Sequence, residues 1–207
     1  MGTSNITLSV SILKSFDLNL TFSFKRISFL FKKYSSNLEI NNLLFCIKDE
    51  QIDVVELASI LNEWIMTNIG DSIENRSNAI SNLNSNPLFI IFTFFNKQLK
   101  FDSTNDDMDL NYKWENRFNR FFQQEIVTSS YNWDTNWTNN NKLFKNFFLL
   151  RDFKYSTDTF IGFDTDGVEK TINPLRKDYL IRLRESFMKY PFVKNHFVNA
   201  EESWDGA

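Results

Sequence analysis

Three short apolar runs punctuate the chain, and each precedes a segment whose apolar residues recur at helical spacing. The runs are Ile40–Ile47 (INNLLFCI), Pro87–Phe95 (PLFIIFTFF) and Phe147–Leu150, the last inside NKLFKNFFLLRDF from Asn141 to Phe153. A continuous apolar run of this length between turn-like segments is typical of a strand buried on both faces of a parallel sheet. We therefore predict three buried strands.

Helical periodicity follows each predicted strand. The predicted helices span residues 53–68, about 114–126 and 174–190, with a short last helix from 191 to about 199. In the second helix Trp114, Phe118 and Phe122 form an apolar stripe, and we place Arg117 and Arg120 off it. Alternating strands and helices require parallel pairing through right-handed crossovers. The prediction is an α/β fold: a parallel sheet of three strands or slightly more, with flanking helices.

The remaining segments give weaker patterns. Residues 7–24 alternate loosely, as one or two half-buried strands do, and residues 25–34 fit a short helix. We predict loops at 71–86, with one helical turn at most, and at 155–171. The loop at 128–140 is expected to fold back onto the domain through its two tryptophans. The predicted division is an N-terminal segment, 1–28, and an α/β domain, 29–207.

Composition excludes several classes of function. A net charge of -3 gives no electrostatic reason to expect nucleic acid or an anionic membrane as partner. One His and one Cys are too few for a Cys/His zinc site, so no metal site is expected, and Cys46 is interpreted as a small buried hydrophobe. With no apolar run near ~18 residues and no secretory signal pattern, a cytoplasmic location is expected.

The glycines argue against a phosphate-binding loop. There are five, at positions 2, 70, 162, 167 and 206, and no pair of them makes G-x-x-x-x-G-K-[ST] or G-x-G-x-x-G. Such loops need glycine because the backbone amides must approach the phosphates closely. We therefore expect no catalytic residues and no standard triphosphate-binding loop in this chain alone.

Several segments nevertheless resemble a known family when taken in chain order. They are FLFKKYSSNLEINNLLFCI, LNEWI, NPLFIIFTFFNK, KWENRFNRFF, NWDTNWT, LFKNFFLLRDF and VKNHFVNAEESWDGA. Together they resemble the GTPase-like domain of the bacterial putative virulence factor family, the SrfC-like group. The order and spacing over roughly 175 residues, more than any one segment, carry the resemblance.

The resemblance implies that strands four to six of a P-loop GTPase-like domain are present. The phosphate loop and the carboxylate that holds Mg²⁺ would lie upstream of residue 29, and residues 1–28 are too short to supply them. The expectation is an incomplete GTPase-like domain, inactive alone, whose partner is the missing N-terminal half. GTP and Mg²⁺ are implied only for a complete family member.

The family's base-reading element resembles T-K-x-D at the end of the fifth strand. The matching residues here are Thr93, Phe94 and Asn96, so the threonine is kept while the lysine and the aspartate are replaced. Asn offers one acceptor and one donor, whereas an aspartate accepts twice from guanine. Lys97 follows and resembles the start of N-K-x-D, but the fourth position is Leu99. We expect Thr93, Asn96 and Lys97 to contact a nucleotide base with weakened guanine selectivity.

A rival base-reading pair is Arg151–Asp152, which follows the third apolar run. FFLLRDF resembles the strand end of guanylate-binding and atlastin-like GTPases, where an Arg-Asp pair reads guanine. The alternative is a structural ion pair or cap at the strand end, which is commoner. Four carboxylates, at 102, 106, 107 and 109, cluster in one connection, but their spacing fits no calcium loop and they are expected in a solvated flexible loop.

A different class of function is a protein-interaction module. In the GTPase strand order, strand four borders strand one, so without strand one Leu43–Ile47 would be an open apolar edge. Such an edge pairs readily with another protein chain. An enzyme with unrelated chemistry finds little support in the residue types present.

Overall fold

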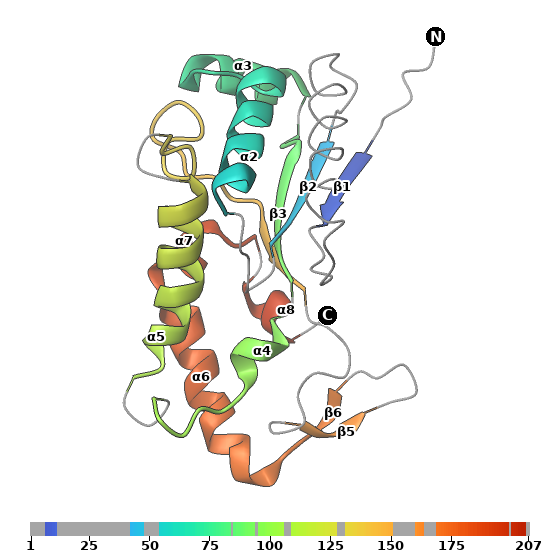
Figure 1. The fold of residues 1–207 in the computed structure, drawn as a ribbon, viewed down its shortest axis with the longest axis vertical. Helices are drawn as coiled ribbons and strands as arrows, with labels where there is room; N and C mark the ends of the chain where they lie inside the picture. Colours follow the sequence, from blue (N-terminus) through green and yellow to red (C-terminus); the bar gives the residue numbers. More distant parts are fainter. Residues whose placement is uncertain are drawn as a thin grey trace.

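A parallel sheet of four strands forms the centre of the fold. In spatial order the strands are β1 (Thr7–Ser11), β2 (Asn42–Ile47), β3 (Leu88–Phe92) and β4 (Phe147–Leu149) (Figure 1). This computed structural model describes residues 7–11, 42–47, 54–83, 85–93, 95–105, 109–127, 131–150, 160–163, 169–198 and 200–205. The predicted α/β fold with a small parallel sheet is confirmed.

The three predicted strands lie side by side in one register. Phe45 of β2 pairs with Ile90 of β3, and Ile90 pairs with Phe147 of β4. Alternate residues point to the same face of a sheet, so these three side chains share a face, and all are fully buried. Leu44 and Phe89, on the opposite face, are half-buried. The expectation of full burial on both faces is therefore wrong for β2, β3 and β4.

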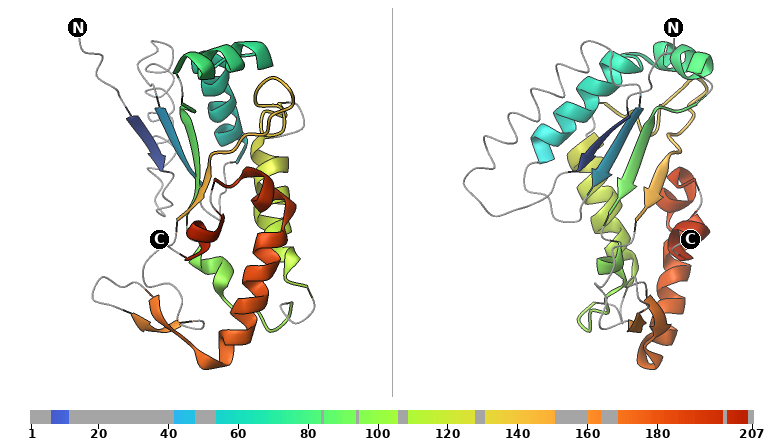
Figure 2. Two further views of the ribbon diagram at one scale, coloured as in Figure 1. Left: turned by 180° about the vertical axis from the view of Figure 1, so that it is seen from behind. Right: turned by 90° about the vertical axis from the view of Figure 1, so that its right-hand side faces the viewer.

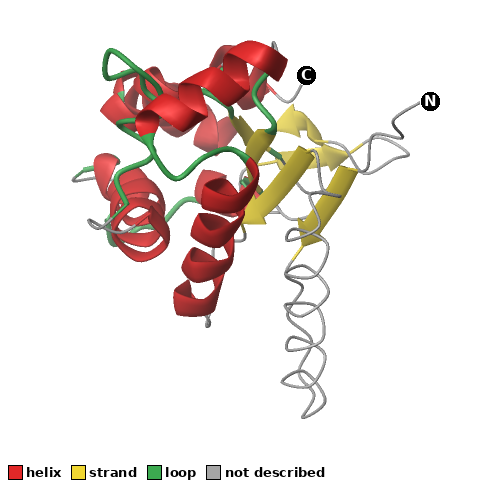
Figure 3. Ribbon diagram, turned by 90° about the horizontal axis from the view of Figure 1, so that it is seen from above, coloured by secondary structure: helices red, strands yellow, loops and turns green. Residues whose placement is uncertain are grey.

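The described helices gather on one side of the four strands, which explains the unequal burial of the two faces (Figures 2 and 3). They are α2 (Val54–Asn68), α3 (Ile73–Leu83), α4 (Asn96–Leu99), α5 (Asn111–Trp114), η1 (Glu115–Val127), η2 (Pro174–Arg176), α6 (Lys177–Lys189), α7 (Pro191–His196) and α8 (Ala200–Asp205). η1 is a π-type helix that continues α5 without a break.

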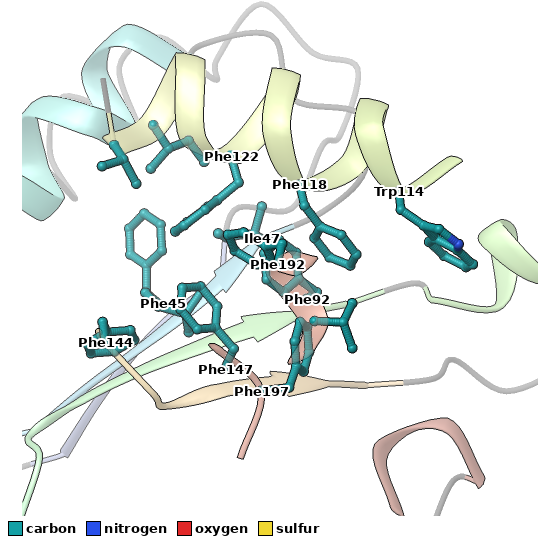
Figure 4. Close-up of a cluster of buried hydrophobic side chains, with 14 of the residues drawn as sticks. Phe45, Ile47, Phe92, Trp114, Phe118, Phe122, Phe144, Phe147, Phe192 and Phe197 are labelled. Atoms are coloured by element: carbon teal, nitrogen blue, oxygen red, sulfur yellow. The ribbon is translucent and has the colours of Figure 1, made fainter. Parts of the chain in front are cut away.

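Aromatic rings fill the space between the sheet and η1. The ring centre of Phe92, the last residue of β3, lies 5.2 Å from that of Phe118 and 5.5 Å from that of Phe122 of η1, edge to face in both pairs. The ring centres of Phe147 of β4 and of Phe197 lie 5.9 and 6.0 Å from that of Phe92. Figure 4 shows these rings converging from strands and helices that are distant in the sequence. Edge-to-face aromatic pairs add to the gain from apolar burial.

The loop that carries the tryptophan pair is folded onto this core, as predicted. Trp133 and Trp137 are buried, and both rings lie against Phe144. Arg76 of α3, also buried, fixes the loop to α3: its guanidinium donates to the carbonyl oxygens of Asn136 and Trp137 at 2.8 and 2.9 Å. Buried carbonyl groups need such donors. The loop is thus part of the folded core.

The C-terminal helices begin where the sequence indicates. The Asn173 side chain accepts a hydrogen bond from the Leu175 amide, and Pro174 occupies the first helical position. Pro191 likewise opens α7. Leu175 lies four residues before the buried Tyr179, a helical spacing that predicts burial on the same stripe, but it is 84% exposed. The reason is that it lies in the short 3₁₀ turn η2, whose i→i+3 spacing rotates it away from the α6 stripe.

Three expectations need correction. Residues 73–83 form the full helix α3, not a loop with one turn. The loop predicted at 155–171 contains an antiparallel hairpin of β5 (Phe160–Phe163) and β6 (Glu169–Ile172). Leu43–Ile47 is no open edge, because β1 pairs with β2 along its length. The edge predicted to recruit another chain is therefore occupied by residues 7–11.

Gly70 ends α2 in a backbone conformation that other residues rarely adopt. Its φ is 153°, and a Cβ at this position would meet the Arg76 amide nitrogen at 2.7 Å. The close approach of α3 to this turn requires a residue without a side chain.

Replacing Gly70 with Ala should lower the free energy of unfolding by about 2 kcal/mol, because the new Cβ strains the turn and collides with α3. Urea denaturation followed by tryptophan fluorescence measures this. Thr67→Ala, on the exposed face of α2, is the matched control and should stay within about 0.5 kcal/mol of the wild type. Equal midpoints for G70A and T67A would contradict the packing described here.

His196 is the only histidine of the chain. It is the last residue of α7, and its side chain is buried against the segment that leads into β4. Its Nδ1 donates to the Phe144 carbonyl at 2.8 Å, and its ring lies 4.5 Å from that of Phe192. Burial lowers the imidazole pKa, an effect strengthened by Lys145 and opposed by the Phe144 hydrogen bond and by Asp134. The folded protein therefore holds a neutral imidazole at pH values where a free one is protonated.

Stability should decrease as the pH falls below 6.5, the ordinary pKa of the imidazole. The unfolded chain takes up a proton there while the folded chain does not, so protonation favours unfolding. Unfolding free energies at several pH values between 5 and 8 test this expectation. His196→Gln keeps a donor for Phe144 and should remove this part of the pH dependence. An imidazole NMR signal that titrates at or above the ordinary pKa would contradict it.

Candidate functional site

The carboxyl ends of β2, β3 and β4 meet at one edge of the sheet, since all three strands are parallel. Open α/β sheets bind ligands at this edge. Thr93 directly follows β3 there, and Asn96 and Lys97 are the first two residues of α4. The structure thus brings these three base candidates together in one turn.

Thr93 is held by the neighbouring strand. Its amide and its hydroxyl both donate to the carbonyl of Ile47, the last residue of β2, at 2.9 and 3.3 Å. The side chain is half-buried. A threonine hydroxyl engaged in this way fixes the path of the chain beyond β3, so Thr93 positions the turn in which Asn96 and Lys97 lie.

Arg151 and Asp152 lie outside the described residues, so their pairing stays a prediction. The residue before them is placed: Leu150 donates its amide to the Phe92 carbonyl at 2.8 Å and accepts from the Phe95 amide at 3.2 Å. The backbone that leads into Arg151 therefore runs beside the turn that carries Thr93.

A polar cavity of about 480 Å³ lies in the same βα connection, between residues 98–103 and helix α5–η1. Its lining includes the cationic side chains Lys100, Lys113 and Arg117, together with Tyr112, Asp102 and Phe121. Sequence reasoning did not find this cavity. Its volume falls within the ordinary range for small-molecule sites.

Arg117 lies at the meeting point of the cavity and the sheet edge, and only 5% of it is exposed. Its Nη2 donates to the Ile47 carbonyl at 2.8 Å and lies 3.4 Å from the Thr93 carbonyl. The guanidinium carbon lies 5.1 Å from the ring centre of Phe92 and 5.5 Å from that of Phe121. Arg117 thus ties η1 to the ends of two strands and fixes a positive charge there.

Lys113 is also buried, with 7% of its surface exposed. Its ammonium donates to the Lys100 carbonyl at 2.7 Å and lies 5.7 and 5.8 Å from the ring centres of Tyr112 and Tyr179. The Tyr179 hydroxyl donates to the same carbonyl at 3.1 Å. These contacts hold the ammonium in one place at the wall of the cavity.

Asp102 is the carboxylate of the lining. One oxygen accepts from the Thr104 amide at 2.9 Å and the other from the Asn105 side chain at 2.9 Å. These hydrogen bonds, the Asn105 bond first, lower its pKa, and Lys113 adds to the effect. Asp102 is therefore ionised at neutral pH, and both of its oxygens are engaged within its own turn.

The described part of the chain lacks the groups needed for a metal centre or a membrane-spanning helix. No group of three or more His, Cys, Asp or Glu side chains there could hold a metal ion. No described helix is both long and apolar enough to cross a membrane. The chemistry of this region is that of hydrogen-bonding and cationic groups.

A signal for Arg117 exists in the sequence. Arg117 lies three residues after Trp114 and four before Phe121, so helical spacing places it on the apolar stripe. The prediction put Arg117 off the stripe, and this is wrong, because the structure buries it. A cation at an apolar position of a helix is informative, since such a side chain must find buried acceptors.

Replacing Arg117 with Met should lower the free energy of unfolding by about 1 kcal/mol, because the Ile47 carbonyl would lose its charged donor while it keeps the hydrogen bond from the Thr93 amide. Arg120→Met, on the exposed side of the same helix, is the matched control and should have little effect. Chemical denaturation measures both. A loss no larger for R117M than for R120M would contradict the anchoring role of Arg117.

Comparison with known proteins gives one match. The profile of a family described as putative bacterial virulence factor matches residues 22–207, which include β2, β3, β4 and the cavity. No curated protein and no solved structure matches the chain. The match covers most of the chain, and the chain belongs to the putative bacterial virulence factor family.

Proposed function

We propose that this chain is the base-binding side of a GTPase-like nucleotide domain and has no hydrolytic activity of its own. The observation that carries the proposal is the turn after β3, where Thr93 leads into α4 beside the ends of β2 and β4. This is where an open α/β sheet presents residues to a ligand.

The strand order supports the proposal. β2, β3 and β4 are consecutive in sequence, adjacent in the sheet and parallel. A helical segment follows β2 and another follows β3, so each crossover has the form expected of strands four to six in the resembled domain. The α/β arrangement alone is shared by many protein classes, so the base-side residues must carry the functional argument.

Base recognition by this turn should be weak and only slightly selective for guanine. The side chain at position 96 is an amide, which accepts one hydrogen bond where a carboxylate would accept two. Arg151–Asp152 is a second source of guanine contacts in the proposal, since the chain enters Arg151 beside the same turn. The two sources predict different effects of substitution.

The chain alone should not hydrolyse a nucleotide, because phosphoryl transfer depends on groups that hold Mg²⁺ and the terminal phosphate. The sequence contains no phosphate-loop motif. A phosphate-binding component, in the same polypeptide or in another chain, is the partner that this proposal implies.

Substituting Asn96 with Asp tests the proposal directly. The carboxylate would restore double acceptance from guanine, so we expect the preference for GTP over ATP to rise about tenfold, as for one good bidentate contact. Titration with fluorescent GTP and ATP analogues measures the two dissociation constants. Asn82→Asp adds the same charge at an exposed position of α3 and should leave the preference unchanged.

Asp152→Asn separates the two base-reading hypotheses. If Arg151–Asp152 reads guanine, this variant loses GTP affinity, and N96D has no effect. If the turn at Thr93 reads the base, N96D changes the preference and D152N does not. Failure of both nucleotides to bind at millimolar concentration, or turnover by the purified chain, would refute the proposed function.

A further inference from the structure

We propose that the cavity between residues 98–103 and helix α5–η1 binds a small organic anion, a molecule with clustered negative charge on phosphate or carboxylate oxygens. The cavity measures about 480 Å³. Its described lining contains none of the nucleotide-base candidates, so the proposal stands even if the nucleotide proposal fails.

Charge is the first reason. The described lining contains three cationic side chains, Lys100, Lys113 and Arg117, and the one carboxylate Asp102. The cavity is open to solvent, so a cation about 4 Å from an anion would contribute between about 1 kcal/mol, as in water, and a few kcal/mol, as near a protein surface. A ligand with two or more negative charges therefore fits the lining, and a cationic ligand does not.

Rigidity is the second reason. Arg117 is anchored by the Ile47 carbonyl and by two aromatic rings, and Lys113 by the Lys100 carbonyl. The entropic cost of ordering these long side chains has therefore been met in the folded protein, before a ligand arrives. Preorganised groups bind more tightly than mobile surface lysines, because binding does not have to immobilise them.

The negative charge of Asp102 does not cancel the positive charge of the three cations that line the cavity. Its two oxygens accept hydrogen bonds from Thr104 and Asn105 within its own turn. The carboxylate thereby shapes the 102–105 turn at the rim of the cavity. Its charge weakens the attraction for an anion, in part through its electrostatic interaction with Lys113, but the described lining still has three cations against this one carboxylate.

The size and the aromatic walls indicate an organic ligand. Inorganic phosphate would fill only a small part of 480 Å³. Phe121 and Tyr112 line the cavity beside the cations, and such faces accept the carbon skeleton of a ligand. Clefts that combine aromatic walls with a few fixed polar groups are the usual form of small-molecule sites.

The test is calorimetric titration of the full chain with pyrophosphate and, separately, with citrate, at low salt and at 150 mM salt. Pyrophosphate represents phosphate chemistry and citrate represents carboxylate chemistry. We expect one of the two to bind saturably, and to bind more weakly at the higher salt because of screening. The tighter probe identifies the chemistry of the natural ligand.

Lys100→Glu is the diagnostic variant. Its side chain is exposed at the cavity, so the change should leave the fold intact while reversing one charge. Affinity for the better probe should fall about tenfold or more. Lys194→Glu reverses a charge on the exposed face of α7 and should leave the affinity unchanged. N96D should also leave it unchanged, which separates this cavity from the base site.

Three outcomes would overturn the proposal. One is that neither probe binds saturably with a dissociation constant below about 10 mM, since weaker binding is no stronger than nonspecific ionic attraction. Another is that K100E and K194E weaken binding equally, which would show a response to net charge alone. The third is that N96D abolishes the binding, which would place the anion at the nucleotide site.

Discussion

The packing of η1 against the buried face of the sheet is the interaction on which the rest of this structure depends. Phe92 packs edge to face with Phe118 and Phe122 of the helix, and Phe147 on the next strand is stacked against Phe92. The strands are short, and their parallel pairing alone would be marginal in water. Burial of these rings is what makes a small sheet stable, and it sets the position of every group that η1 carries.

Arg117 connects that core to the candidate site. It emerges from the same helix as the buried rings, lies over Phe92 and donates to the end of β2. The sheet edge, the turn at Thr93 and the cavity therefore share one buried cation. A rearrangement of η1 that moves Arg117 would therefore alter its contacts at the sheet edge and the lining of the cavity together.

Much of the fold follows from local patterns in the sequence. The three apolar runs, the Asn173–Pro174 helix start and the tryptophan loop all have short-range signals, and the structure confirms each of them. The helix α3 was missed although Ser72 caps it by accepting from the Asn75 amide. A polar segment gives little periodicity, and its helix is secured by the distant contact of Arg76 with the tryptophan loop.

The candidate site was predicted less fully than the fold. The strand pattern places the end of β3 just before Thr93, because a strand end is a local feature, whereas the base-binding role of Thr93, Asn96 and Lys97 stays a prediction. The cavity arises where residues 98–103 meet η1, a tertiary arrangement that no single segment encodes. The burial of Arg117 likewise depends on the Ile47 carbonyl, seventy positions away in the sequence.

The position of β1 has a consequence for how the chain is divided. β1 occupies residues 7–11, ahead of residue 22 where the family match begins, yet it is bonded along β2. The family match therefore leaves out a strand of the sheet. A strand from another chain could pair with this edge of β2 only after displacing residues 7–11.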